Sequence, residues 1–510
     1  MLRDPKMSQQ FTQQQTAQPL ENSFPFFRRQ VSRLLGSEGV LQTRLGLFLL
    51  VASIVFLSRI PFLGDGYGTH PDAWRVANAA SLIAKTGHYS ASRFPGYPFQ
   101  EIVYALIPWK SPLVFNGLTA LLSSLGIASF ALVLRRLKCT NVLLFSFAVA
   151  GIPVIFTNSV VSLDYLWALS FALISLLLLL ENRIGLSAVF LGLAIACRIT
   201  SAALLIPYLF LVRASQDKHP NTLRILTFSA VSIFIGALFF FPVLDTYGLA
   251  FLQYYQSQYP SALYVVKAAT VEIFGMAGCG ALLIVIFVSV GGKHRVSSFP
   301  ECPPKLRTAL TQVSIVICAI YALLFLALPA KPAYLIPAVP FFLLLLGFRI
   351  RRTYFAGLCV ILTLSSLLLS AYTVSGTVIA PSSSLAIHFS LQGRDVIVDP
   401  LVGPILHKHR LAIVQQQYIS RVISRSMAPP RNSVVVAGAW LPQLAVTLQE
   451  PIDAVSPCAS FVRQGVTFTE LLSQQPDTSR HVFFLSQQQA YNQLVTGLDL
   501  SGIGATEIQF

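Results

Sequence analysis

The sequence predicts a multi-spanning α-helical membrane protein with about eleven transmembrane helices and a small C-terminal α/β domain outside the membrane. Hydrophobic residues make up 54% and charged residues only 11% of the 510 residues, whereas roughly 25% of residues are charged in soluble domains. The mean hydropathy is +0.67, and several apolar runs approach the roughly 20 residues that a helix needs to cross a bilayer. Basic residues also fall in every second loop between these runs.

The apolar runs give the predicted spans. In chain order they are residues 44–63, 112–134, 142–157, 163–180, 184–197, 200–213, 224–242, 271–290, 309–328, 334–348 and 353–374. Residues 184–213 allow two interpretations, one long tilted helix or two short helices that meet near Arg198. We expect two short helices, because a single helix would reverse the side of every later basic loop. Each would be roughly 21 Å long, which is tolerated where short helices are buried among others or line a polar cavity.

Basic residues mark one set of loops as cytoplasmic, because short loops rich in Lys and Arg stay on that side of a membrane. These residues are Arg28, Arg29, Arg33, Arg44, Arg135, Arg136, Lys138, Arg183, Arg213, Lys218, Arg224, Lys293, Arg295, Lys305, Arg307, Arg349, Arg351 and Arg352. The amino terminus is therefore expected inside and the carboxyl terminus outside a plasma (inner) membrane. These loops and contact with anionic membrane lipids account for the net charge of +16, so no nucleic-acid partner is expected.

Three segments differ in composition. Residues 1–43 are expected to form a disordered or amphipathic cytoplasmic segment, since its first part is rich in Gln, Ser and Thr. Residues 44–375 form the transmembrane domain, which includes a long external loop, residues 64–111. Residues 376–510 are expected to form an extracytoplasmic α/β domain.

Short β-like runs support the α/β assignment of this last segment. They are residues 395–398, 433–436 and 481–485, and more helical stretches lie between them. The segment contains one of the seven cysteines, Cys458, so no internal disulfide can form in it. The chain also has no Asn-x-Ser/Thr acceptor, and both absences favour a bacterial membrane.

The external loop 64–111 carries acidic residues, which are scarce in this chain, at the mouth of the predicted bundle. Asp72 begins an amphipathic stretch, and it is either a helix N-cap or a general base that activates an acceptor. The apolar face of this stretch consists of Ala73, Val76, Ala77, Ala80 and Ile83. Asp65 has Gly-rich, turn-like neighbours and ranks second as the base. Asp164 opens a later span on the same side, as a helix cap or as a second carboxylate of a site.

Four short motifs follow one another along residues 44–375, all on the predicted outer side. They are the Asp72 loop leading through Phe94-Pro95-Gly96-Tyr97-Pro98 to Glu101, the turn Asn158–Asp164, the hairpin Gly192–Thr200 followed by Pro207, and Lys331-Pro332-Ala333-Tyr334-Leu335-Ile336-Pro337. In this order they resemble the membrane glycosyltransferases of the C superfamily (GT-C), which include protein O-mannosyltransferases and lipid A aminoarabinose transferase.

The resemblance implies transfer of a sugar from a polyprenyl-phosphate donor to an acceptor at the outer face, with inversion and without a nucleotide sugar. Asp72 would then be the base for the acceptor hydroxyl, and anionic surroundings would stabilise oxocarbenium character at the sugar. The leaving phosphate needs cations, for which Arg198 and Lys331 are candidates, with Arg93 and Lys85 behind them. An ionisable residue inside an apolar stretch is a functional candidate by default, although Arg198 can also cap a helix or snorkel to headgroups.

The acceptor, the metal and the reaction class stay open. Ala73 follows Asp72 where protein O-mannosyltransferases have an Asp-Glu pair, so the acceptor can be a glycolipid, a polysaccharide or a protein. A divalent cation near His70, Asp72 and His88 is conceivable, but their spacing matches no strict ligand motif, and no metal is assigned. Two other functions remain as alternatives: a transporter or flippase of lipid-linked sugars, and a polymerase or ligase of surface polysaccharide.

Overall fold

The computed structural model describes most of the transmembrane domain and parts of the C-terminal segment. The described residues are 43–214, 221–249, 259–290, 297–328, 330–373, 381–391, 394–426, 433–436, 440–448, 459–461, 481–485 and 506–508. The chain divides into two compact units, Met1–Leu47 and Phe48–Phe510, and every residue of the site described below belongs to the second. The predicted disordered or amphipathic segment 1–43 lies, except for its last residue, outside the described residues.

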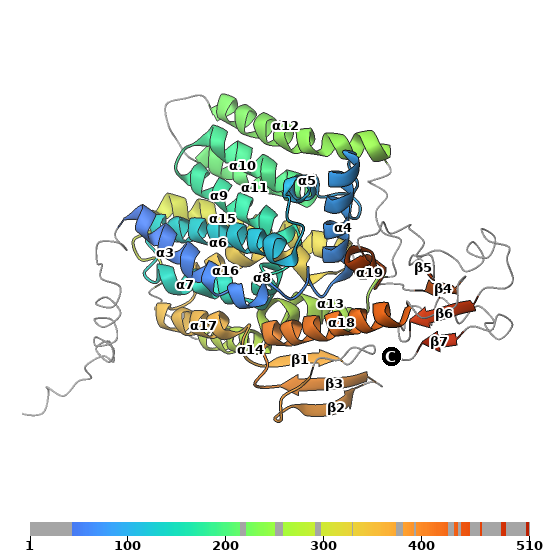
Figure 1. The fold of residues 1–510 in the computed structure, drawn as a ribbon. Coiled ribbons are helices and arrows are strands. Elements are labelled where there is room, and N and C mark those ends of the chain that lie inside the picture. The colour runs from blue at the N-terminus through green and yellow to red at the C-terminus, as the bar shows by residue number, and fades with distance from the viewer. Residues whose placement is uncertain are drawn as a thin grey trace, which may run out of the picture. The chain divides into compact units, whose positions relative to one another are not determined.

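Helices follow the predicted apolar runs in chain order (Figure 1). The first part of the chain forms α3 (Arg44–Leu57), α4 (Pro71–Thr86), α5 (Pro98–Leu106), α6 (Pro112–Arg136), α7 (Val142–Gly151), α8 (Pro153–Asn158), α9 (Tyr165–Leu180), α10 (Ile184–Cys197), α11 (Leu205–Ala214) and α12 (Asn221–Tyr247). The second part forms α13 (Ala262–Ala269), α14 (Val271–Val290), α15 (Pro304–Ala327), α16 (Val339–Arg349), α17 (Arg352–Leu364), α18 (Pro404–Ser426) and α19 (Leu441–Leu448). Short 3₁₀ helices occupy Ile60–Phe62, Ile199–Leu204 and Pro332–Ala338.

The chain is a multi-helix membrane protein. Within the described residues, 6 helical segments are long and apolar enough to cross a membrane, and shorter apolar helices of 10–17 residues lie at the other five predicted spans. The predicted span limits shift by several residues in the structure, and two spans change more substantially. The span 142–157 is divided at Pro153, which begins α8 and has no N–H with which to continue α7. The span 353–374 ends as α17 at Leu364, and the chain then enters a β-strand.

Hydrogen bonds join three of the basic loops at one end of the helices. The Thr140 N–H donates to the carbonyl of Ser298 at 3.0 Å, and the Ser298 N–H donates to the carbonyl of Gly347 at 3.3 Å. Ser297 also pairs with Arg351 in an isolated β-bridge. Loops that the sequence assigned to one side of the membrane therefore meet in space. That this side is cytoplasmic stays a prediction.

The break predicted within residues 184–213 is present at Arg198. α10 ends at Cys197, and Arg198 has an extended backbone with φ −150° and ψ 116°. α10 packs along α9 and α12, and Arg224 near the start of α12 donates a hydrogen bond to Asn182 in the turn between α9 and α10. α12 therefore starts at the end of α10 that lies away from Arg198, as two short helices require.

Two small sheets follow the helices. β1 (Ser370–Thr373), β2 (Ile387–Leu391) and β3 (Arg394–Asp399) form an antiparallel sheet in the order β1-β3-β2, with Ser370 opposite Asp399 and Ile387 opposite Val398. The second sheet is parallel, in the order β5-β4-β6-β7, and consists of β4 (Ser433–Val436), β5 (Ala459–Phe461), β6 (His481–Leu485) and β7 (Thr506–Ile508). The three predicted β-like runs fall in β3, β4 and β6.

Close helix packing supports the end of the bundle that carries the site. α6 packs along α9, and α9 along α10, as Figure 1 shows. A Cβ atom at Gly126 would lie 2.5 Å from the hydroxyl oxygen of Ser170, so the glycine permits this approach of α6 and α9. At the end away from the basic loops, residues 64–97, the start of α9 and the 3₁₀ helix Pro332–Ala338 come together.

Candidate functional site

The start of α4 fixes the position of Asp72. Pro71 occupies the first helical position, where its missing N–H costs nothing, and Gly87 ends the helix in the left-handed conformation with φ +70°. The Asp72 N–H donates to Nδ1 of His70 at 3.2 Å, which makes His70 the N-cap residue. The interpretation of Asp72 as the N-cap of this helix is therefore wrong. Its carboxylate is left for other partners.

Three cations surround the carboxylate of Asp72, whose side chain is only 5% exposed. Arg75 Nη1 lies 2.8 Å, Lys331 Nζ 3.4 Å and Arg93 Nε 3.5 Å from its oxygens. Burial by itself raises the pKa of Asp72, but the nearby charges, Arg93 foremost, outweigh it and hold the pKa below the ordinary range. Asp72 is therefore ionised at any physiological pH.

Asp164 lies fully buried just before α9 and binds two arginines. Arg93 Nη2 donates to Asp164 Oδ1 at 2.6 Å, and Arg198 Nη1 donates to Oδ2. Aromatic rings cover both guanidinium groups, since the Tyr97 ring centre lies 4.0 Å from Arg93 Cζ and the Tyr165 ring centre 4.0 Å from Arg198 Cζ. Asp164 occupies the N-cap position of α9 but makes no capping hydrogen bond, so its carboxylate serves the arginines.

Arg93 links the two carboxylates into one group, which we call the Asp72–Asp164 network. Its members are the carboxylates Asp72 and Asp164 and the cations Arg75, Arg93, Arg198 and Lys331. Four cations against two carboxylates leave an excess of two positive charges. Such an arrangement, largely withdrawn from water, favours the binding of an anion nearby.

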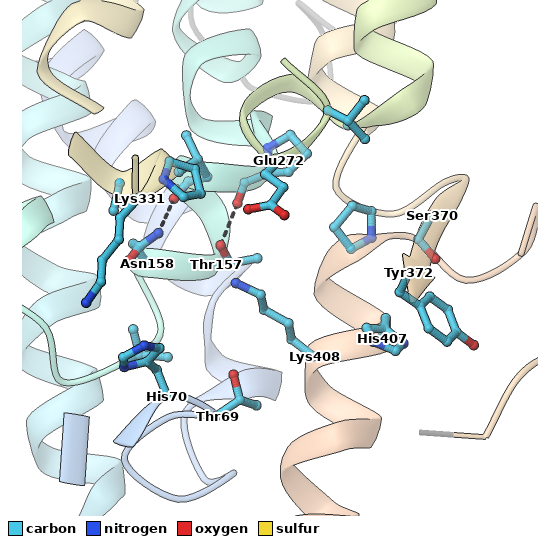
Figure 2. A pocket seen from close by; sticks show the side chains of 18 of the residues that line it. Thr69, His70, Thr157, Asn158, Glu272, Lys331, Ser370, Tyr372, His407 and Lys408 are labelled. Atoms are coloured by element: carbon cyan, nitrogen blue, oxygen red, sulfur yellow. Dashed lines mark hydrogen bonds between the residues drawn. The ribbon is translucent and has the colours of Figure 1, made fainter. Parts of the chain in front are cut away.

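A cavity of about 430 Å³ opens beside Asp72 and Lys331 (Figure 2). It is bounded by the loop before α4, by α8, α13, α14, β1 and α18. Its other polar lining residues are Thr69, His70, Thr157, Asn158, Tyr165, Tyr264, Lys267, Glu272, Ser370, Tyr372, His407 and Lys408. Arg93 and Arg198 do not line the cavity, and they support Asp72 and Asp164 from within the protein.

A buried carboxylate organises the segment that carries Arg93. Glu101 on α5 has no exposed surface and accepts hydrogen bonds from the Tyr89 hydroxyl, from the Ser92 N–H at 2.8 Å and from the Tyr97 N–H at 3.2 Å. Burial raises the pKa of Glu101, and these donors oppose the rise. Glu101 therefore folds residues 89–97 back on themselves and positions Arg93 between the two aspartates.

The remaining candidates from the sequence lie outside the cavity lining. Asp65 contacts His409 of α18 through its carboxylate. Lys85 and His88 are exposed at and just after the end of α4, away from the Asp72–Asp164 network. Among the described residues, no group of three His, Cys, Asp or Glu side chains is arranged to hold a metal ion.

Sequence reasoning missed three charged lining residues. Lys267 and Glu272 form an ion pair at 3.3 Å on the wall built by α13 and α14. The sequence does contain an indication for Glu272. It is the second residue of the predicted span 271–290, which begins on the same side of the membrane as Asp72. No sequence pattern indicates Lys408, because its position in the cavity depends on how α18 packs against the rest of the protein.

The fold and the site define a helical membrane protein with a buried, net-positive carboxylate–cation network beside a cavity. No protein-family model and no curated protein matches the chain. Among solved structures, the chain is similar to ArnT from Cupriavidus metallidurans bound to undecaprenyl phosphate. The two share 12% identity with a TM-score of 0.49, over 90% of this chain and 89% of that chain. At this level of similarity the likeness transfers no residue role to this chain.

Proposed function

We propose that the protein is a glycosyltransferase that moves a sugar from a polyprenyl-phosphate donor to an acceptor at the outer face of the membrane, with inversion. The observation that carries this proposal is the Asp72–Asp164 network at the wall of the cavity. It places an ionised carboxylate beside an excess of two positive charges, in a protein with apolar helices around it. A reaction that deprotonates a hydroxyl and releases a phosphate needs both features in one place.

In the proposed reaction the acceptor oxygen forms a bond to the anomeric carbon, and the bond from that carbon to the phosphate oxygen breaks. The electron pair leaves with the phosphate, and Asp72 takes the proton of the acceptor hydroxyl. A carboxylate with a depressed pKa is a weak base, so Asp72 needs relief from its cations as the reaction proceeds. Lys331 provides this relief if its ammonium group turns from Asp72 to the leaving phosphate.

The phosphate-binding roles divide among the candidate cations by position. Lys331 lines the cavity and can touch the phosphate directly. Arg93 and Arg198 are bound to Asp164, and we assign them to the field that attracts the anion. One Arg93 donor, Nη1, has no hydrogen-bond partner among the described residues. Lys85 lies outside the cavity lining, and the proposal gives it no role.

The decisive experiment is glycosyl transfer by the purified protein in detergent. A panel of radiolabelled polyprenyl-phosphate hexoses and pentoses is tested with glycolipid, glycan and peptide acceptors, and wild type is compared with Asp72→Asn. We expect turnover of one donor by the wild type and at least a hundredfold loss in the variant, since general acid–base catalysis contributes about 10²–10⁴-fold. Absence of turnover with every donor, together with saturable binding of the lipid, would favour a transporter instead.

A matched variant separates loss of the carboxylate from loss of the network. Arg75→Met removes one ion pair of Asp72, but Arg75 is 33% exposed and leaves Arg93 and Lys331 in place. Transfer should survive in Arg75→Met and not in Asp72→Asn. Wild-type turnover in Asp72→Asn would move the base to another residue.

A further inference from the structure

The cavity wall built by α18 comes from a part of the chain remote in sequence from Asp72. Asp65 of the external loop contacts His409 of α18, and the Phe62 ring packs edge-on against the same imidazole with ring centres 5.5 Å apart. Ile405 at the start of α18 is buried in an apolar cluster with Leu63. These contacts hold the first turns of α18 against the loop that precedes α4.

Lys408 is the residue of α18 that brings a positive charge to the cavity. It lines the cavity, and Figure 2 shows its side chain extending from α18 into this space. The other lining cations are paired, Lys331 with Asp72 and Lys267 with Glu272. Among the described residues, no carboxylate lies within ion-pair distance of the Lys408 ammonium group, and no acceptor lies within hydrogen-bond distance of it; Glu272 is the carboxylate that it interacts with over a longer distance.

We propose that Lys408 binds an anionic group of a substrate in the cavity, namely a phosphate carried by the donor lipid or by the acceptor. A paired cation must give up its partner before it serves a ligand, whereas Lys408 interacts with the Glu272 carboxylate only beyond ion-pair distance and has no ion pair to break. An ammonium group has three rotatable donors, which suits a phosphate approached from more than one direction. The inference rests on the proposed function for the nature of the substrate, and the Asp65–His409 contact positions the helix that carries Lys408.

The test measures equilibrium binding to the purified full-length protein in detergent. One arm compares a polyprenyl monophosphate with the corresponding polyprenol, and the second arm compares a phosphorylated glycolipid with its dephosphorylated form. We expect the wild type to prefer the phosphorylated ligand in at least one arm, and Lys408→Met to reduce that preference about tenfold, as expected for one hydrogen bond to a charged group. Lys408→Arg should retain most of the preference.

The arm that responds identifies the source of the phosphate. A reduced preference in the first arm assigns Lys408 to the donor, and a reduced preference in the second assigns it to the acceptor. A matched control is Lys305→Met, at the exposed start of α15 among the basic loops, which should bind as the wild type does. The proposal is overturned if the wild type binds the phosphorylated and unphosphorylated ligands equally well in both arms. It is also overturned if Lys408→Met keeps the wild-type preference in both arms.

Failure of this inference is distinguishable from failure of the proposed function. Both arms measure binding, so they give a result whether or not sugar transfer is detected. Absence of turnover with every donor contradicts the glycosyltransferase proposal and leaves the binding preference measurable. An unchanged preference in Lys408→Met contradicts only the role of Lys408.

Discussion

Replacement of Arg93 by methionine tests whether the Asp72–Asp164 network holds the site together. The change removes the link between the two carboxylates and leaves the fully buried Asp164 with Arg198 alone. Removing one partner of a buried ion pair costs about 3–5 kcal/mol, because the remaining charge keeps its desolvation penalty. The Arg93 side chain is 7% exposed, so little solvent screening reduces this cost.

The matched control is again Arg75→Met, which removes the other arginine that contacts Asp72. The Arg75 side chain is 33% exposed, and an exposed pair of this kind contributes about 0–1 kcal/mol. The free energy of unfolding would be measured for both variants and the wild type by denaturant titration in mixed micelles. A cost for Arg93→Met that is no larger than that for Arg75→Met would refute the inference that Arg93 joins the two halves of the site.

Three further predictions concern stability. Glu101→Gln should lower the free energy of unfolding by about 1–3 kcal/mol, since the amide has one acceptor oxygen fewer for the three donors around it, and the same titration measures this loss. The pKa of Asp72 is depressed in the folded state, so its stabilising contribution is complete above the ordinary pKa of 3.8 and is lost as the pH falls below it. Stability followed from about pH 5 to about pH 3 should therefore fall more in the wild type than in Asp72→Asn. Gly151→Ala should cost about 1–3 kcal/mol, because its Cβ would lie 2.4 Å from the Thr363 carbonyl oxygen. Gly280→Ala, inside α14 with nothing within 4 Å of its Cβ, should instead be neutral or stabilise by up to about 1 kcal/mol.

The sequence was most informative about the spans, because the length and position of an apolar run report directly on the solvent around a helix. The break at Arg198 was predictable for a similar reason, since the alternation of basic loops fails without it. Contacts between distant segments were not predictable in this way. Asp65 was ranked as a possible base from its local turn, and its contact with His409 depends on packing across more than 300 residues of sequence.

The candidate residues show the same division. Asp164, Arg198 and Lys331 drew notice because charges at apolar spans are rare, and the structure brings all three into one network. The pattern that placed Asp72 at the start of a helix was right about the helix and wrong about the cap, since His70 accepts the first-turn N–H instead. Lys408 lies on an ordinary polar helix, so its charge acquires meaning only from the cavity that it faces.

The proposed reaction requires a carboxylate that is ionised at rest and still accepts a proton, and the network offers a way to meet both requirements. Lys331 is one of the cations that depress the pKa of Asp72, and it also lines the cavity in which the phosphate is proposed to bind. A cation that turns to the phosphate withdraws from Asp72, and the proton affinity of the carboxylate then rises. In the proposed reaction Asp72 is therefore a stronger base when Lys331 has turned to the phosphate than when the cavity holds no anion. The proposal therefore couples the basicity of Asp72 to occupancy of the cavity by the donor.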